Sequence, residues 1–342
     1  MSKVEIKEIT YGEFGKCVQL TNGDVEVVVT VDLGPRVIRY GLPGKPNVFC
    51  EAPGKVLNEK TGWCIHGGHR VWHSPENDPR CYEPDNDPIE WQKLEHGIHV
   101  ISNLEPNTGL LKEMEITLDE EGTAVSVLHR ITNANLWPID FSVWCLSVMA
   151  PGGKEIVPMS QEDTGLLGNR WLGLWPYTRM NDERVWWGEN FITLRQDVNC
   201  SQPFKFGITN DLGWAAYYNH GQAFVKRYIH YPDAPYPDNG MSYETYTNDF
   251  MLEMESLSPL CTVDPAESME HEEIWMLVDG VEAPEDDDEA IAEAVQTLVK
   301  ACSCCCEDDG AECCCGSHDD DCGCGCGDDS TESDCGCGCG GQ

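Results

Sequence analysis

The densest group of chemically active side chains lies in a short stretch that reads CIHGGHRVWHSPE. Its polar members are three histidines, one arginine and one glutamate: His66, His69, His73, Arg70 and Glu76. Histidine spacings of three and four residues would align zinc ligands on a helix, but the Gly-Gly pair and the proline disfavour a helix. The glycines would instead let the backbone approach a ligand closely. The stretch therefore favours a site for a polar, hydroxyl-rich ligand, with Arg70 as a fixed donor and His69 as a proton carrier. Hydrogen-bonded structural histidines are the alternative.

A second group of candidate residues lies between 243 and 259, where acids interrupt an apolar sequence. In an extended strand, Glu253 and Glu255 share one face with Met251. A carboxylate on such a face is costly to bury unless it is paired or used, and burial raises its pKa toward that of a general base. One of the two could instead face solvent, since antiparallel sheets often have a wet side. Trp175 lies in an irregular stretch, where its ring would either stack on a sugar or join the core.

The C-terminal segment carries a different chemistry, because it is rich in Cys-Cys-Cys and Cys-Gly-Cys runs and contains no Lys or Arg. Thiolates at this density bind soft ions such as Zn²⁺ or Cu⁺, and the segment resembles metallothioneins. Redox or modified cysteines, or an inert extension, are the alternatives. The predicted metal ligands are Cys302, Cys304, Cys305, Cys306, Cys313, Cys314, Cys315, Cys322, Cys324, Cys326, Cys335, Cys337 and Cys339.

Composition limits the classes of partner. The 342 residues include 22 Lys and Arg against 60 Asp and Glu, a formal net charge of −38. This balance argues against binding to nucleic acid, which needs clustered cations, and against an anionic membrane surface. The N-terminus lacks an apolar signal region, and no apolar run reaches the length of a membrane span. We therefore expect a cytoplasmic protein with reduced thiols and a small-molecule or protein partner.

The elements that must position these residues are mostly strands. Residues 25–31 are β-branched throughout, and residues 114–118 and 124–131 alternate around a Glu-Glu-Gly turn, as in a hairpin. Further strands are predicted at 140–148, 191–195, 205–208, 214–218, 223–228, 250–257 and 271–277. Many short strands in one run predict an all-β fold, a large antiparallel β-sandwich.

One helix is predicted near the end of the strand-rich part. Acids at its start suit the helix dipole, and Ile291, Val295, Leu298 and Val299 form an apolar stripe over about 286–300. The chain thus divides into a β-sandwich at 1–281, an acidic amphipathic helix within 282–300 and a Cys/Gly/Asp-rich, low-complexity tail at 301–342.

Several ungapped motifs in one order resemble a family. They are DLGPRVIRYG from Asp32, GGHRVWHSPE from Gly67, the stretch from Trp144 to Gly153, ETYTN from Glu244 and MLEMESLSP from Met251. Together they resemble, over about residues 4–280, an uncharacterised family of unknown function that is similar to the galactose-mutarotase-like superfamily. That resemblance implies the large β-supersandwich fold.

The resemblance also implies roles. Aldose epimerases of this fold use a Glu base in a Phe-x-Leu-Glu-like context, which Phe250-Met-Leu-Glu253 resembles, and a His acid on a mid-chain strand. No histidine occurs between Asn133 and Val148, so His69 is the substitute acid. The further ligand-binding candidates are Arg36, Arg70, His73, Glu76, Trp175, Lys226 and Glu244.

The sequence therefore predicts a domain that binds a sugar or sugar phosphate without a cofactor of its own. Its expected chemistry, if it is an enzyme, is aldose 1-epimerase-like proton transfer by Glu253 and His69. The alternative is a non-catalytic scaffold whose cysteine tail binds, sequesters or delivers metal ions.

Overall fold

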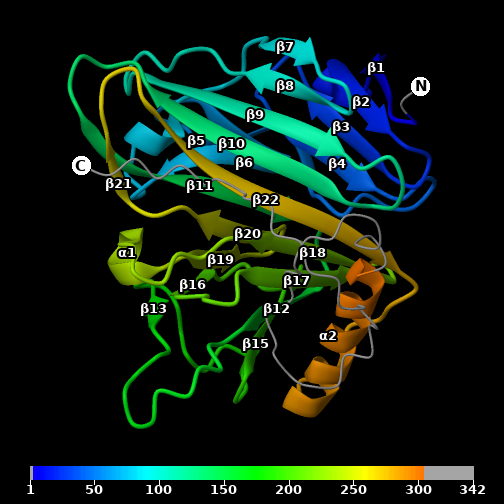
Figure 1. Cartoon of the computed structure of the whole chain (residues 1–342), viewed down its shortest axis with the longest axis vertical. Helices are drawn as coiled ribbons and strands as arrows, with labels where there is room; N and C mark the ends of the chain where they lie inside the picture. The colour runs from blue at the N-terminus through cyan, green and yellow to red at the C-terminus, as the bar shows by residue number, and fades with distance from the viewer. Residues whose placement is uncertain (1–2, 304–342) are drawn as a thin grey trace, which may run out of the picture. The chain divides into compact units, whose positions relative to one another are not determined.

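A computed structural model describes residues 3–303, and two large antiparallel sheets form most of this part of the chain (Figure 1). The all-β sandwich predicted from the sequence is confirmed. The first sheet has 12 strands and the second has 10. Within the described residues, no helix is long and apolar enough to cross a membrane.

The first sheet carries the residues that matter most below. Its order is β1 (Glu5–Thr10), β2 (Lys16–Thr21), β3 (Glu26–Thr30), β4 (Val37–Gly41), β6 (Trp63–Ser74), β11 (Ile139–Met149), β20 (Leu252–Leu257), β19 (Tyr243–Thr247), β16 (Phe204–Ile208) and β13 (Leu172–Leu174). Two strands lie off this path: β5 (Glu51–Asn58) pairs with β6, and β21 (Cys261–Val263) pairs with β11.

The second sheet runs β14 (Val185–Trp187), β15 (Phe191–Arg195), β12 (Lys154–Pro158), β17 (Trp214–Asn219), β18 (Gln222–Tyr228), β22 (Ser268–Asp279), β10 (Val125–Asn133), β9 (Leu110–Leu118), β8 (Gly97–Ile101) and β7 (Glu90–Lys93). The predicted hairpin is its β9–β10 pair, in which Val125 lies opposite Leu118. Every second residue of both strands is buried, which is the pattern expected of a sheet with one wet face.

The core lies between the sheets. Aromatic rings from both sheets meet there, with Phe49 at 5.6 Å from Trp275 and 5.7 Å from Phe224 between ring centroids. Tyr40 completes this group at 5.8 Å from Trp275. Such edge and tilted contacts add to the burial of large apolar surfaces.

The predicted helix is α2 (Asp288–Ser303), and a second, one-turn helix is α1 (Pro237–Gly240). In α2, Ile291 and Leu298 are buried and belong to an apolar cluster with Tyr218 and Met276 of the second sheet. The helix therefore covers part of the outer face of that sheet, beside β17 and β18 (Figure 1). Val299, predicted to belong to the stripe, is 43% exposed.

A kink in β6 decides which of its side chains share a face. His66, Gly67 and Gly68 have φ values of 53°, 91° and 67°, in the left-handed region that favours glycine. A Cβ on Gly67 would collide with the carbonyl oxygen of Cys50, and one on Gly68 with that of Val37. The glycines thus allow neighbouring strands, not a ligand, to approach, which corrects the sequence-based interpretation.

Candidate functional site

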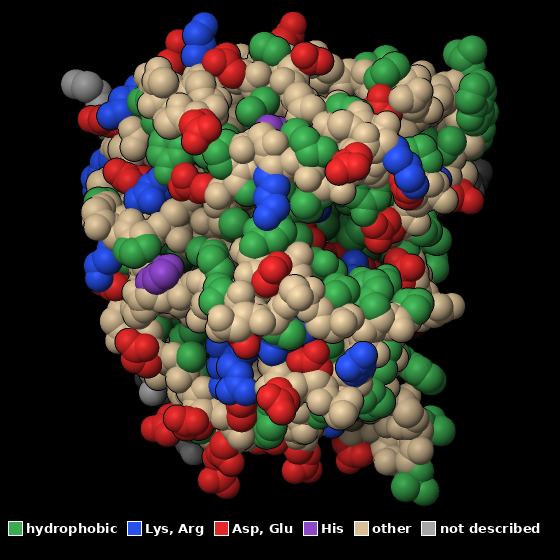
Figure 2. Space-filling model, turned by 180° about the vertical axis from the view of Figure 1, so that it is seen from behind, with side chains coloured by type: hydrophobic (Ala, Val, Ile, Leu, Met, Phe, Trp, Pro, Cys, Tyr) green, Lys and Arg blue, Asp and Glu red, His purple; other side chains and the backbone are tan. Residues whose placement is uncertain are grey.

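A cavity of about 750 Å³ lies on the outer face of the first sheet. Five adjacent strands form its floor, because alternate residues of each strand point away from the core. The floor residues are Arg70 and Trp72 of β6, Trp144 of β11, Glu253 and Glu255 of β20, Glu244 and Tyr246 of β19 and Lys205 of β16. Figure 2 looks onto this side of the molecule and shows a hollow that holds acidic and basic side chains.

The kink in β6 brings residues of opposite parity to this face. Trp63 precedes the kink and Arg70 and Trp72 follow it, yet all three line the cavity. In an uninterrupted strand, odd- and even-numbered residues would point to opposite faces. The left-handed residues therefore enlarge the aromatic part of the floor.

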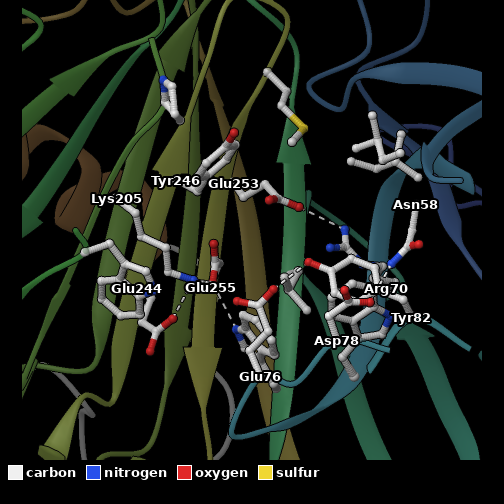
Figure 3. A pocket seen from close by; sticks show the side chains of 18 of the residues that line it. Asn58, Arg70, Glu76, Asp78, Tyr82, Lys205, Glu244, Tyr246, Glu253 and Glu255 are labelled. Atoms are coloured by element: carbon white, nitrogen blue, oxygen red, sulfur yellow. Dashed lines mark hydrogen bonds and ion pairs between the residues drawn. The ribbon is translucent and has the colours of Figure 1, made fainter. Parts of the chain in front are cut away.

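One half of the site is a buried lysine held by two carboxylates. The Nζ of Lys205 lies 2.6 Å from Glu244 Oε2 and 2.9 Å from Glu255 Oε2, and the indole Nε1 of Trp144 donates to Glu255 Oε2 at 3.0 Å (Figure 3). Glu244 and Glu255 lie directly opposite each other on paired strands. The cavity thus places two carboxyl groups around one ammonium group.

Burial has the largest effect on the pKa values of Lys205, Glu244 and Glu255. It raises the pKa of Glu244 to about 8 and that of Glu255 to about 7, although the Lys205 charge acts in the opposite direction. Burial would lower the pKa of Lys205, but the Glu244 and Glu255 charges hold it well above its ordinary value. At neutral pH the lysine is therefore charged, Glu244 is mostly protonated and Glu255 is near the midpoint of its titration, so the two carboxyl groups together hold between one and two protons.

The other half of the site is an arginine–glutamate pair. Arg70 Nη1 donates to Glu253 Oε1 at 3.0 Å (Figure 3). The guanidinium group stacks on Trp72, 4.3 Å from the ring centroid, and lies 5.2 Å from that of Trp63. These contacts fix the Glu253 carboxylate and the arginine plane in the cavity.

Aromatic rings contribute to both the floor and the walls of the cavity. Trp63, Trp72, Trp144, Trp175, Tyr82, Tyr177 and Tyr246 all line the cavity. The Tyr82 hydroxyl donates to Glu76 and orients that carboxylate (Figure 3). Flat apolar rings beside hydrogen-bonding carboxylates are suited to a ligand with one apolar face and an edge of hydroxyl groups.

The structure brings together five of the predicted site residues and separates four others. Glu253, Arg70, Glu76, Trp175 and Glu244 line the cavity. His69, His73, Arg36 and Lys226 do not line it.

His69 lies in the core between the sheets, which corrects its predicted placement beside Glu253. His129 Nδ1 donates to the His271 carbonyl at 2.9 Å, so its Nε2 accepts a hydrogen bond from His69 Nε2 at 2.7 Å. Ser147 then donates to His69 Nδ1 at 2.8 Å. Burial holds the pKa of His69 well below its usual value, so the ring is neutral and cannot protonate a ligand in the cavity.

Lys226 belongs to the same buried network. Its Nζ lies 2.8 Å from Glu273 Oε1, and Trp275 Nε1 donates to Glu273 Oε2 at 2.7 Å. Ligand atoms of His69, His129 and Glu273 lie within 4.8 Å of one another. Because these hydrogen bonds and the ion pair already satisfy them, the network is complete as a structural polar core.

The remaining predicted residues also have other surroundings. His73 is buried, with Nε2 at 3.8 Å from Cys81 Sγ. Arg36 pairs with Asp85 beside a second, smaller cavity. His66 Nδ1 accepts a hydrogen bond from the Gly54 amide at 3.2 Å, and the ligand atoms of His66, His69 and His73 do not all lie within 4.8 Å of one another. Thus His66, His69 and His73 do not form the alternative zinc site.

Sequence reasoning missed Lys205 and left Glu255 without a role. The available signal for Lys205 was a single lysine between Phe204 and Phe206, both of which are buried in the core. A charge at the alternate position of an apolar strand marks its other face.

Almost all of the cysteines predicted to bind metal in the C-terminal segment lie outside the residues that the structure describes. Cys302 lies in the last turn of α2, and the other twelve predicted cysteines lie beyond residue 303, outside the described residues.

Neither a family model nor a curated protein sequence matches this chain. Solved structures do match it. A TPR-domain containing protein from Parabacteroides distasonis is 13% identical, with a TM-score of 0.53, over 79% of this chain and 49% of that one. This chain therefore spans about half the length of that protein.

Two further structures match over most of both chains. A candidate aldose 1-epimerase from Klebsiella pneumoniae is 12% identical, with a TM-score of 0.53, over 87% of each chain. A galactose mutarotase-like protein from Lactobacillus casei is 11% identical, with a TM-score of 0.51, over 77% of this chain and all of that one (100%). The fold therefore is that of the galactose mutarotase-like β-sandwich proteins, as the sequence motifs predicted.

Proposed function

We propose that the cavity binds a carbohydrate and catalyses aldose 1-epimerase-like proton transfer at its anomeric carbon. The observation that carries the proposal is an aromatic-walled cavity of about 750 Å³ whose floor places Glu244, Glu253 and Glu255 on adjacent strands. The fold shared with mutarotase-like proteins supports the same chemistry. Fold alone does not define an activity, so the residues must carry the argument.

Glu253 is the proposed base and Glu255 the proposed acid. They are alternate residues of β20, about 7 Å apart along the strand, so both carboxyl groups reach one sugar ring. Lys205 and Trp144 both donate to Glu255 Oε2, which leaves Oε1 to carry the proton. A Glu255 pKa raised to about 7 by burial keeps that proton available near neutral pH.

The proposed step opens the sugar ring. Glu253 accepts the proton of the anomeric hydroxyl, and Glu255 donates its proton to the ring oxygen. The bond between the anomeric carbon and the ring oxygen breaks, and a carbonyl group forms. Rotation about the adjacent carbon–carbon bond and the reverse proton transfers then close the other anomer. Glu244 and Arg70 are proposed to hold hydroxyl groups during this exchange.

Polarimetry tests the proposal with freshly dissolved α-anomers of glucose and galactose. The full chain should accelerate the change in optical rotation, and Glu253→Gln should lower kcat by a factor on the order of 10²–10⁴. Because Glu253 is paired with the buried Arg70, the variant should also lose stability, so its rate is measured at a temperature where circular dichroism shows that it is folded. Glu90→Gln, which removes an exposed carboxylate of β7 on the second sheet, is the matched control. Equal rates for both variants would overturn the catalytic role of Glu253.

We also propose that the cysteine-rich segment binds soft metal ions, independently of the sugar site. The thirteen cysteines in Cys-Cys-Cys and Cys-Gly-Cys runs support it. This proposal keeps the non-catalytic alternative open to test, because metal binding and sugar turnover are measured separately.

A further inference from the structure

The cavity has a large excess of acidic side chains. Of the described residues that line it, Arg70 and Lys205 are the only basic ones. The acidic ones are Glu76, Asp78, Asp238, Glu244, Glu253 and Glu255. A cleft lined by one sign of charge attracts ligands of the opposite sign.

Both cavity cations are already in ion pairs. Arg70 is paired with Glu253 at 3.0 Å, and Lys205 is shared between Glu244 and Glu255 at 2.6 and 2.9 Å. A phosphate or carboxylate ligand would have to break one of these pairs. Asp78 is paired with Lys60 at 2.6 Å, but Glu76 and Asp238 have no ion-pair partner among the described residues and would repel an anion. The charges of the cavity therefore disfavour the binding of an anionic sugar derivative.

Glu244 has an unused acceptor. The residue is 1% exposed, and its Oε1 has no hydrogen-bond partner among residues 3–303, whereas its Oε2 holds Lys205. Leaving a buried carboxylate oxygen unpaired costs stability. A donor on the ligand would satisfy this oxygen, and a charged donor would do so most strongly.

The charged groups that face Glu244 are one cation and two acids, so a second cation is missing from its surroundings. Lys205 attracts it, while Glu255 and Asp238 repel it. Burial and these acids raise the pKa of Glu244 to about 8, so Glu244 retains a proton at neutral pH. A second cation beside this carboxyl group would stabilise its ionised form instead. A bound cation would displace that proton and leave the proton of Glu255 in place.

We propose that the ligand of this cavity is a polyhydroxylated compound with a protonated amine, an amino sugar, whose ammonium group binds Glu244 Oε1. This inference rests on the proposed carbohydrate binding and adds the charge of the ligand. The aromatic walls support the same cation, since an ammonium group is attracted to the faces of Trp and Tyr rings.

Titration calorimetry on the full chain compares galactosamine with galactose and glucosamine with glucose, at about pH 6.5 where the amines are charged. Glucose 6-phosphate is the anionic probe. Each amino sugar should bind about 10–100-fold more tightly than its neutral partner, as expected for one charged hydrogen bond, and the phosphate should bind most weakly. Added salt should reduce the preference for the amine.

Two variants locate the effect. Glu244→Gln should reduce the preference to less than about threefold, because a neutral amide loses the charge but keeps the shape. Glu90→Gln removes a carboxylate outside the cavity and should keep the full preference. Repeating the titration in buffers of different ionisation enthalpy should show proton release with the unmodified chain and none with Glu244→Gln.

The outcomes separate this inference from the proposed function. Equal affinity for galactose and galactosamine, or tighter binding of glucose 6-phosphate, would overturn the inference and leave carbohydrate binding intact. Binding of ethanolamine as tight as that of galactosamine would support the cation site and overturn the carbohydrate. Failure of every probe to bind would overturn both.

Discussion

Replacing Lys205 by methionine tests the charge balance on which the site depends. Lys205 is 4% exposed and holds Glu244 and Glu255 at 2.6 and 2.9 Å. Its Nζ also lies 4.9 Å from the Trp144 ring and 4.7 Å from that of Trp175. Methionine keeps the apolar stem between these rings but removes the charge, so the variant isolates the electrostatic contribution.

The expected loss follows from the burial of the partners. Removing one member of a buried ion pair leaves an uncompensated charge and costs about 3–5 kcal/mol of unfolding free energy. Burial already raises the pKa of Glu244 to about 8 and that of Glu255 to about 7 with Lys205 present. Without the lysine, both pKa values rise further.

The sign with pH follows from linkage. A carboxyl group whose folded pKa lies above its unfolded value loses stability as pH rises from the unfolded value to the folded one. The Lys205→Met variant should therefore lose about 3–5 kcal/mol at pH 8, where its carboxyl groups must ionise or hold protons at a cost. At about pH 5 both are protonated in the folded state, and most of the loss should disappear.

Urea denaturation followed by tryptophan fluorescence measures the unfolding free energy of the variant and of the unmodified chain at pH 5 and at pH 8. Lys45→Met is the matched control, since Lys45 pairs with Asp279 at 3.0 Å while both side chains are 47% exposed. That surface pair should contribute little at either pH. Equal losses for the two variants, or a Lys205→Met loss that is the same at pH 5 and pH 8, would refute the electrostatic reasoning.

Two further predictions concern the strand kink and the tail. Gly67→Ala should lower the melting temperature in thermal denaturation more than Gly54→Ala. Both glycines have positive φ, but only a Cβ at position 67 would collide with a neighbouring backbone. Equal shifts for the two variants would contradict the packing argument. Elemental analysis after zinc loading should find about three or more Zn²⁺ per chain, with proton release on binding and loss at acid pH. Zinc retained after the thirteen tail cysteines become serine would contradict this prediction.

The sequence predicted the sheets well because alternation is a local signal. The hairpin of β9 and β10 and the strand β15 could be read from residue types alone, since each has a clear buried face or a short apolar run. The pairing order of the sheets was not predictable in this way. Long segments of chain separate β6 from β11, β11 from β20 and β16 from β19, although the two strands of each pair are neighbours in the sheet.

The candidate site was only partly predictable for the same reason. Glu253, Glu255 and Met251 were placed on one face by their spacing, and all three line the cavity. Lys205 lies on β16, which joins the site through β19, so its role depends on pairing that no local pattern shows. Trp175 reaches the cavity from a connecting segment, where no periodicity applies.

The placement of His69 follows from a constraint that was present in the sequence. His69 and Arg70 are adjacent, and Arg70 reaches Glu253 from a regular part of β6 that is paired with β11. Adjacent residues of a paired strand point to opposite faces of the sheet. Once this part of β6 is a paired strand, an Arg70 contact with Glu253 therefore directs His69 into the core. A shared role for His69, Arg70 and Glu253 would have required a loop, and the kink that could have supplied one ends at Gly68.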